Sequence, residues 1–302
     1  MKKILIIYPS WEDRSSKGFL KDMQYSFTEV LLIRNSSNHC ESFNEQLSQI
    51  EDACKKESIA INYVDIYNDS IKNWLELNKE VEKRVNINDE VILDITTMSR
   101  NIVWTILYIL RTKVQKVDIV YHLPQTYAKD WISREPNQPQ LLLKHSGIYD
   151  LGKETVLLII TGFDEERTKY MLSKYEPKKV YLFIQTGSQF DNTDRNNADT
   201  HKKICKEYGL NEEDIILKSI DAYSNDLGFS VIESAINTEA ESNIILASFG
   251  PKPSAIAVYK SYMQHPEIAL CYLPCNEYNQ QYCQGIGDSV SYTLTFPTEE
   301  EV

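Results

Sequence analysis

The sequence lacks any long apolar run, and none approaches the roughly 20 residues needed to cross a bilayer. It has no GxGxxG motif after the first predicted strand and no GxxxxGKS or GxxxxGKT motif. A dinucleotide-dependent dehydrogenase and a P-loop ATPase therefore have no support. HExxH and GxSxG motifs are absent as well. Near the start, the apolar stretch Ile4–Tyr8 is too short for a signal peptide and charged residues follow at once, so we predict a first strand of a cytoplasmic protein that does not enter a membrane.

Metal-ligand patterns are also missing. The six cysteines form no CxxC pair, and Cys271, Cys275 and Cys283 have no cysteine or histidine partner at zinc-finger spacing. The five histidines are scattered along the chain. We therefore predict no metal site and no cofactor, and we interpret the cysteines as reduced thiols packed inside a cytosolic protein.

Basic residues are outnumbered. The chain has 32 lysines and arginines against 44 aspartates and glutamates, which gives a net charge of −12 over 302 residues. Duplex binding depends on many contacts between basic side chains and phosphates, so this charge argues against a broad nucleic-acid surface. It does not exclude a small local pocket for one phosphate-bearing ligand. The length suffices for two domains that each bury a core.

The chain contains an internal repeat. Residues 90–124 and 243–274 share one order: an apolar run, a short polar turn that ends near a cation, a helix-like stretch, a second apolar run and a Leu-Pro pair. The match extends to Lys3–Pro9 and Thr155–Thr161, each of which is followed by an aromatic residue, acidic residues and an arginine. Self-similarity of this kind indicates two copies of one structural unit.

The repeated unit has the pattern of an α/β fold. Short apolar runs that alternate with helical segments predict βαβ units and a parallel sheet. Val91–Ile95 and Ile244–Leu246 are continuously apolar, which is typical of central strands covered on both faces. We expect two tandem Rossmann-like units with helices on both faces of each sheet, at residues 1–140 and 153–302. Leu141–Leu143 suggest an extra strand between them, and Ser289–Thr295 a matching strand at the end of the second copy.

The strongest candidate site follows the strand Val91–Ile95. Ligands bind at the carboxyl ends of strands in open parallel sheets. Here Thr96, Thr97 and Ser99 offer hydroxyls, the start of the predicted helix offers backbone N–H groups, and Arg100 adds a positive charge, a combination that suits an anion or a nucleotide phosphate. The alternative is that Thr97 or Ser99 only caps the helix, while Asp94 satisfies buried backbone donors.

The corresponding turn of the second copy is also specialised. Gly250 permits close backbone approach and Lys252 supplies a positive charge, whereas Asp94 is replaced by Ala247. This asymmetry suggests that only one copy could hold a catalytic carboxylate, or that the ligand itself is asymmetric. Further along, Tyr127 and Tyr278 belong to aromatic loops that could stack on a base, or could instead form an interface between the halves.

At Asp94–Arg100 the chain resembles the CARF family of nucleotide sensors of prokaryotic defence systems. The resemblance implies a ligand of the cyclic oligonucleotide or other nucleotide type, bound by Thr96, Thr97, Ser99 and Arg100. Ser10 and Trp11, after the first strand, would be the second matched site. CARF pockets usually form between two protomers. By this resemblance, the two copies would build the equivalent cleft in one chain, with Gly250 and Lys252 facing the Asp94–Arg100 turn.

Three functions are compatible with these residues. The first is a nucleotide sensor in an antiviral defence or regulatory system, which would signal to a separate effector protein. The second is an enzyme, a nucleotide or nucleoside hydrolase of the ring-nuclease type, in which Arg100 and Lys252 stabilise phosphate charge and Asp94 orients a nucleophile. The third is a scaffold whose aromatic loops dock another protein. We favour the sensor, leave the chemistry unassigned, and treat formation of a homo-oligomer as open.

Overall fold

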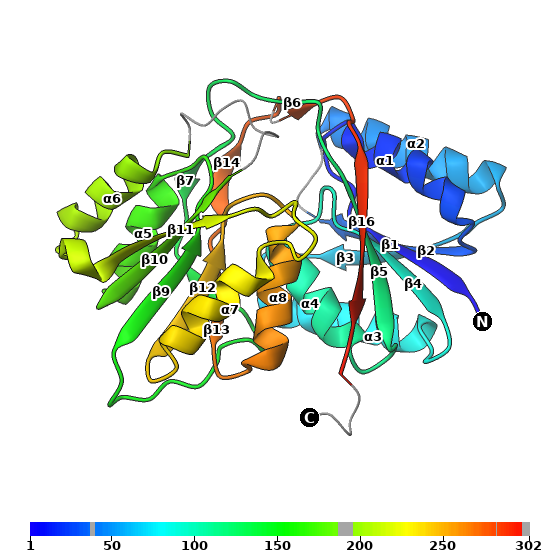
Figure 1. Ribbon diagram of the computed structural model, residues 1–302. Helices are drawn as coiled ribbons and strands as arrows, with labels where there is room; N and C mark the ends of the chain where they lie inside the picture. The colour runs from blue at the N-terminus through cyan, green and yellow to red at the C-terminus, as the bar shows by residue number, and fades with distance from the viewer. Residues whose placement is uncertain (37–39, 187–195, 282, 298–302) are drawn as a thin grey trace. The chain divides into compact units, whose positions relative to one another are not determined.

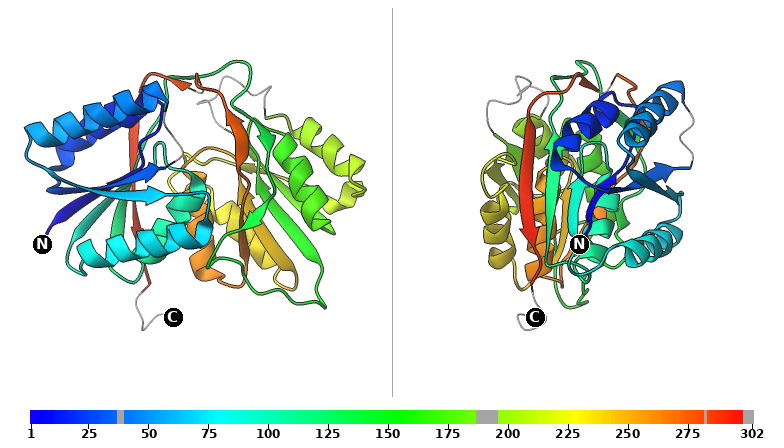
Figure 2. Two further views of the ribbon diagram at one scale, coloured as in Figure 1. Left: turned by 180° about the vertical axis from the view of Figure 1, so that it is seen from behind. Right: turned by 90° about the vertical axis from the view of Figure 1, so that its right-hand side faces the viewer.

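The computed structural model describes residues 1–36, 40–186, 196–281 and 283–297 (Figure 1). The chain forms two compact units. Met1–Lys129 and Gln280–Val302 make up unit 1, and Asp130–Asn279 make up unit 2. Each unit contains a mostly parallel sheet flanked by helices (Figures 1 and 2), so the predicted α/β fold with two Rossmann-like units is confirmed. Within the described ranges, no helix combines the length and the apolar character needed to cross a membrane.

The sheet of unit 1 has the strand order β16-β5-β4-β1-β2-β3, and only β16 runs antiparallel to its neighbour. Its central residues Ile4, Leu5 and Ile6 are completely buried, as expected for a strand covered on both faces. The strands are β1 (Lys3–Ile7), β2 (Glu29–Asn35), β3 (Ala60–Ile66), β4 (Glu90–Asp94), β5 (Lys116–His122) and β16 (Ser289–Thr295). The helices are α1 (Arg14–Asp22), the 3-10 turn η1 (Met23–Tyr25), α2 (Glu41–Lys56), α3 (Ser70–Arg84) and α4 (Arg100–Leu110).

The sheet of unit 2 repeats this arrangement in the order β8-β13-β12-β9-β10-β11, again with one antiparallel edge strand. The strands are β8 (Gln140–Leu141), β9 (Thr155–Ile160), β10 (Lys179–Gln185), β11 (Ile215–Ile220), β12 (Asn243–Ser248) and β13 (Ala269–Tyr272). The helices are α5 (Glu166–Tyr175), α6 (Ala198–Glu207), the 3-10 turn η3 (Glu212–Asp214), α7 (Phe229–Thr238) and α8 (Ser254–Gln264). Both units thus have one topology, as the repeat predicts.

The two copies exchange their last strands. β8 follows β5 in the first copy but pairs with β13 in unit 2, and β16 follows β13 in the second copy but pairs with β5 in unit 1. Two short antiparallel ribbons lie along these connections. They are β6 (Thr126–Tyr127) with β15 (Cys283–Gln284), and β7 (Ser133–Pro136) with β14 (Cys275–Tyr278). Each copy therefore completes the sheet of the other.

This exchange corrects the predicted division of the chain at residues 140 and 153. Residues 130–140 belong to unit 2, and the tail from residue 280 belongs to unit 1. The predicted strand Ser289–Thr295 exists, but it does not end the sheet of its own copy; it pairs with β5 along seven residues. The extra strand predicted near Leu141 is present as β8. A short strand can pair with any open sheet edge, and the local sequence does not show which one.

A buried histidine in unit 2 makes the stability of the protein depend on pH. The ring of His201 on α6 is 1% exposed, and its Nδ1 lies 3.0 Å from Thr168 Oγ1 on α5. Burial lowers the pKa of His201 from 6.5 to about 4. Because the folded pKa lies below the unfolded one, the unfolded chain takes up a proton first as the pH falls. Stability is therefore complete above the unfolded pKa and is lost as the pH falls from 6.5 towards 4.

We expect His201→Gln to remove this pH dependence. In the wild-type protein, the histidine should lower the free energy of unfolding by about 2–3 kcal/mol between about pH 7 and pH 4.5. Urea unfolding at several pH values, for the wild type and for His201→Gln, measures the difference between the two curves. The other titrating groups are common to both proteins. If the free energy of unfolding changes with pH in the same way for the wild type and for His201→Gln, His201 is not the source of the pH dependence.

Candidate functional site

The carboxyl ends of β1 and β4 form the point in unit 1 where the strand order reverses. From β1 the chain continues to β2 and β3 on one side of the sheet, and β4 and β5 lie on the other side. Ligands of open α/β sheets bind at such switch points. Ser10 and Trp11 follow β1, and Thr96, Thr97, Ser99 and Arg100 follow β4. The structure therefore brings these two predicted groups to the same switch point.

The two threonines tie neighbouring strands together. Thr97 Oγ1 donates a hydrogen bond to the carbonyl oxygen of Tyr8, which joins the loop after β4 to the loop after β1. Thr96 Oγ1 accepts a hydrogen bond of 2.9 Å from the backbone N–H of His122 at the end of β5. Thr96 is 1% exposed. Both hydroxyls thus shape the switch point, and their contact with a ligand stays a prediction.

Ser99 and Arg100 begin helix α4. Ser99 is the N-cap residue and has extended backbone angles, but its side chain forms no capping hydrogen bond. Thr97 donates to Tyr8 instead, so neither hydroxyl has the capping role considered as the alternative. Both Ser99 and Arg100 are partly exposed. A hydroxyl, the first turn of a helix and a cation therefore lie together at the switch point, which is the combination that anions favour.

Ser10 has a local structural role. Its hydroxyl accepts a hydrogen bond of 3.1 Å from the backbone N–H of Glu12, and its own N–H donates to Ser15 Oγ at 3.1 Å. Ser10 is 3% exposed, whereas Trp11 is partly exposed. These bonds order the entry into α1. The ligand contact that the CARF resemblance implies for Ser10 and Trp11 stays a prediction.

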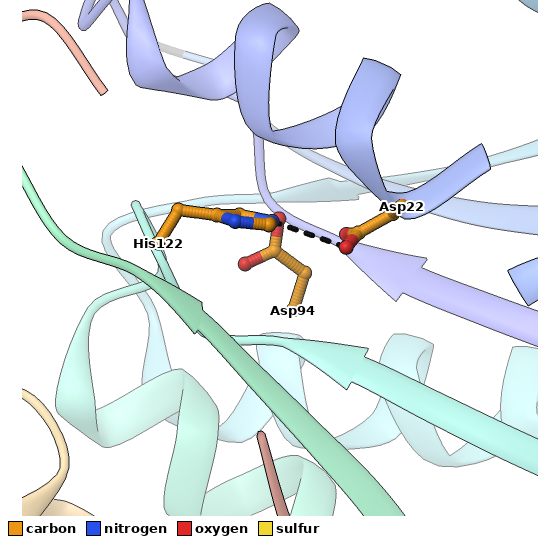
Figure 3. Close-up of side chains that lie close together, drawn as sticks. All are labelled: Asp22, Asp94 and His122. Atoms are coloured by element: carbon orange, nitrogen blue, oxygen red, sulfur yellow. Dashed lines mark hydrogen bonds and ion pairs between the residues drawn. The ribbon is translucent and has the colours of Figure 1, made fainter. Parts of the chain in front are cut away.

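Asp94 points into the interior of unit 1. Its carboxylate is 6% exposed, and Oδ1 accepts a hydrogen bond of 2.7 Å from the backbone N–H of Thr96. The same carboxylate lies beside Asp22 and His122 (Figure 3), and their ligand atoms are all within 4.8 Å of one another. Asp94 therefore acts as an acceptor for a buried backbone donor, as the alternative interpretation stated. This position does not suit a residue that orients a nucleophile at the surface.

The three buried side chains affect each other electrostatically. His122 Nε2 lies 3.1 Å from Asp22 Oδ1, and Nδ1 lies 2.7 Å from Ser289 Oγ. Burial and the negative charge of Asp94 raise the pKa of Asp22 to about 7. Burial alone would lower the pKa of His122, but the hydrogen bond to Asp22 and the charges of both carboxylates outweigh it and raise that pKa. The sequence did not predict this cluster, because its members come from a helix end and two strand ends far apart in the chain.

A buried arginine occupies the same place in both units. In unit 1, Arg14 Nη2 lies 2.6 Å from Glu12 Oε2, and Cys283 Sγ lies 2.9 Å from that same oxygen. In unit 2, Arg167 Nε lies 3.3 Å from Asp164 Oδ2, and Nη2 lies 3.1 Å from Cys275 Sγ. These groups fix β15 in unit 1 and β14 in unit 2. In the sequence, this shared role is indicated by the repeated pattern of an aromatic residue, acidic residues and an arginine after β1 and after β9.

The thiols in these two groups are poor nucleophiles. Burial, with a smaller contribution from Glu12, raises the pKa of Cys283. Burial also raises the pKa of Cys275, and the nearby Arg167 only partly opposes the shift. A cysteine nucleophile acts as the thiolate, and a raised pKa keeps it protonated near neutral pH. The structure thus gives no support to cysteine catalysis at either position.

The predicted residues of the second copy lie in unit 2. A Cβ added to Gly250 would come within 2.9 Å of the carbonyl oxygen of Thr161, so glycine permits close approach between two backbone segments at the ends of β9 and β12. Lys252 is partly exposed just before α8, and Tyr278 is 38% exposed at the end of β14. In unit 1, Tyr127 OH lies 3.4 Å from Tyr121 OH. That one ligand binds to both copies stays a prediction.

Comparison with known proteins gives no family. No family model and no curated protein matches the chain. Among solved structures it is similar to a Pseudomonas aeruginosa UCBPP-PA14 protein described as a universal stress protein, with 10% identity over 90% of this chain and 92% of that chain and a TM-score of 0.27. It is also similar to the cytoplasmic domain of a prokaryotic cation chloride cotransporter, with 12% identity over 93% and 99% of the two chains and a TM-score of 0.30.

Proposed function

We propose that the protein binds a phosphate-bearing ligand of the nucleotide type at the loops that follow β1 and β4. The observation that carries this proposal is the start of α4 at the switch point of unit 1. There, the Ser99 hydroxyl is not used for capping, and Arg100 occupies the first helical position. Phosphate oxygens accept hydrogen bonds from hydroxyl, backbone N–H and guanidinium donors, and all three kinds lie at this helix start.

The finer proposal is a sensor of nucleotide signals in a prokaryotic defence or regulatory system. It is supported by the resemblance of Asp94–Arg100 to the CARF motif and by the position of that motif at the end of β4. Cyclic oligonucleotides are therefore the ligands to test first, next to linear nucleotides. A separate effector protein would receive the signal.

Binding without turnover is favoured over hydrolysis. Asp94 is the carboxylate that a hydrolase would need at this turn, but its oxygen accepts from Thr96 N–H and it faces Asp22 and His122 in the interior (Figure 3). The buried thiol of Cys283 has a raised pKa and offers no alternative nucleophile. The residues at the start of α4 can hold charge, but none of them is an evident general base.

The proposal is tested by titrating the 302-residue chain with linear and cyclic nucleotides, using calorimetry for binding and chromatography for products. Arg100→Ala is expected to weaken binding about 10- to 100-fold, the usual effect of losing a hydrogen bond to a charged group. Ser99→Ala should weaken nucleotide binding less than Arg100→Ala does. Arg111→Ala is the matched control, because Arg111 lies at the other end of the same helix beside Tyr108 and should leave the affinity unchanged. Equal losses for Arg100→Ala and Arg111→Ala, or no binding of any nucleotide, would contradict the proposal.

A further inference from the structure

Two carboxylates and an imidazole converge inside unit 1, with no lysine or arginine paired to the carboxylates in the described part of the chain. Asp22 and His122 are completely buried and Asp94 is 6% exposed. Among the ion pairs of the described residues, neither aspartate meets a lysine or an arginine; the only partner is His122, at 3.1 Å from Asp22. Two buried carboxylates without compensation are costly, so positive charge has to reach this place as protons or as a cation.

One oxygen of the cluster is buried and has no hydrogen-bond donor. Asp22 Oδ2 is buried and has no hydrogen-bond donor, although Oδ1 of the same carboxylate meets His122 Nε2. Figure 3 shows all three side chains directed at one another from α1, β4 and β5. A buried carboxylate that lies beside a second carboxylate and an imidazole can act with them as a ligand set.

We propose that Asp22, Asp94 and His122 bind one divalent metal ion of the Zn²⁺ type. One imidazole nitrogen and two carboxylate oxygens are ligands that Zn²⁺ accepts, and Mn²⁺ also suits them. The ligand atoms lie within 4.8 Å of one another. In a tetrahedral zinc site with bonds of about 2.0–2.2 Å, ligand atoms are about 3.3–3.6 Å apart, so only a small contraction is needed.

The surroundings of His122 orient it as a ligand. Ser289 Oγ, 2.7 Å from Nδ1, can accept the proton of that nitrogen, which leaves the lone pair of Nε2 directed at the cluster. On its other side the ring packs against Gly18 of α1, where an added Cβ would come within 2.6 Å of the ring carbon Cδ2. Glycine at this position therefore lets the helix lie against the imidazole and brings Asp22, four residues further along α1, into reach.

The ion would act as a structural link beneath the switch point. It would join the end of α1 to the ends of β4 and β5. Through Asp94, whose Oδ1 accepts a hydrogen bond from Thr96 N–H, it would also fix the turn that leads to α4. This role goes beyond the proposed nucleotide site, because the metal is held in the interior and does not depend on a bound nucleotide. The sequence predicted no metal site, since no spacing motif connects the three ligands.

The test uses the 302-residue chain, freed of metal with a chelator and titrated with Zn²⁺ and, separately, Mn²⁺. Equilibrium dialysis with metal analysis should give one high-affinity ion per chain, and the midpoint of thermal unfolding should rise on binding. Asp22→Asn should lower the affinity by more than about tenfold. Asp118→Asn is the matched control on β5, because Asp118 accepts a hydrogen bond from Thr293 and should bind metal like the wild type.

Cobalt substitution keeps the proposal testable if Asp22→Asn fails to fold. Co²⁺ bound to the wild type should show the visible bands of nitrogen and oxygen coordination, without a thiolate charge-transfer band. A thiolate band would place the metal at cysteines and overturn the proposal. It would also be overturned if neither ion binds, or if a folded Asp22→Asn takes up metal as the wild type does. Nucleotide binding is measured separately, so a failure here leaves the proposed function standing.

Discussion

A fragment of residues 130–279 is expected to fold on its own, whereas a fragment of residues 153–302 is expected to be largely unfolded, although the two have equal length. The first fragment is unit 2 as the structure has it. The second is the complete second copy of the repeat, but it lacks the segment before β9 and carries β16 without its partner β5. Strand exchange therefore makes the repeat boundary the wrong place to divide the chain.

The missing segment supplies a substantial part of the core of unit 2. Ile132 and Leu142 are buried, and His145 lies with its ring 4.5 Å from that of Tyr262. Leu142 N–H donates to the carbonyl of Leu270, and Leu270 N–H donates to that of His145. At about 1.5–3 kcal/mol for each buried apolar side chain, together with these contacts, the loss is about 5 kcal/mol or more, which approaches the whole stability of a small domain.

Circular dichroism and thermal unfolding of the two purified fragments measure this difference. The 130–279 fragment should give one cooperative transition, and the 153–302 fragment should give none or one at a much lower temperature. Adding a separately produced 1–152 fragment to the 153–302 fragment should restore a cooperative transition. The 1–152 fragment supplies β5, which pairs with β16, and β8, which pairs with β13. Cooperative unfolding of the 153–302 fragment alone, with a disordered 130–279 fragment, would contradict the exchange.

Replacing Arg14 by leucine should destabilise the protein by about 3–5 kcal/mol, the usual cost of removing one partner of a buried ion pair. Arg14 is 2% exposed, and its guanidinium meets both Glu12 Oε2 at 2.6 Å and the carbonyl oxygen of His122 at 2.9 Å. The variant leaves the Glu12 carboxylate, which is 8% exposed, without its cation. Urea unfolding near neutral pH gives the difference in free energy.

Lys17→Ala is the control for this variant. Lys17 lies on the same helix and pairs with Asp13, but the two side chains are 51% and 35% exposed. An exposed pair of this spacing contributes about 0.3–0.5 kcal/mol. Combining Arg14→Leu with Glu12→Leu should recover part of the loss, because no uncompensated charge is then left. If Arg14→Leu lowers the free energy of unfolding no more than Lys17→Ala does, the buried Arg14–Glu12 pair does not have the structural role assigned to it.

The sheets of both units could be predicted because their signal is local. Val91–Ile95 and Ile244–Leu246 are continuous apolar runs, and such runs in alternation with helices define a parallel α/β fold. The exchange of β8 and β16 could not be predicted in the same way. β16 alternates exposed and partly buried residues, and only Leu294 in it is fully buried, so its pattern fits the edge of either sheet. Its partner is decided by long-range packing.

At the candidate site, too, the sequence predicts the residues with a local signal but not those that only long-range packing brings together. Thr96, Thr97, Ser99 and Arg100 could be located because they follow a recognisable strand, and the switch-point rule assigns importance to that position. The cluster of Asp22, Asp94 and His122 could not. Asp22 ends a helix, and nothing in its neighbourhood distinguishes it from a solvated acid until folding places it beside Asp94. The role of Arg14 was visible only as a repeated sequence pattern.

The exchanged strands also set an order for folding during synthesis. Unit 2 is one continuous segment, Asp130–Asn279, and can be complete as soon as that segment has left the ribosome. Unit 1 begins earlier but ends later, because the outer edge of β5 has no partner until Ser289–Thr295 have been made. Ser289 also arrives only then to meet His122. The sheet of unit 1 therefore keeps an open edge at β5 until β16 has been synthesised. Unit 2, which lies between the two parts of unit 1 in the sequence, can fold before that.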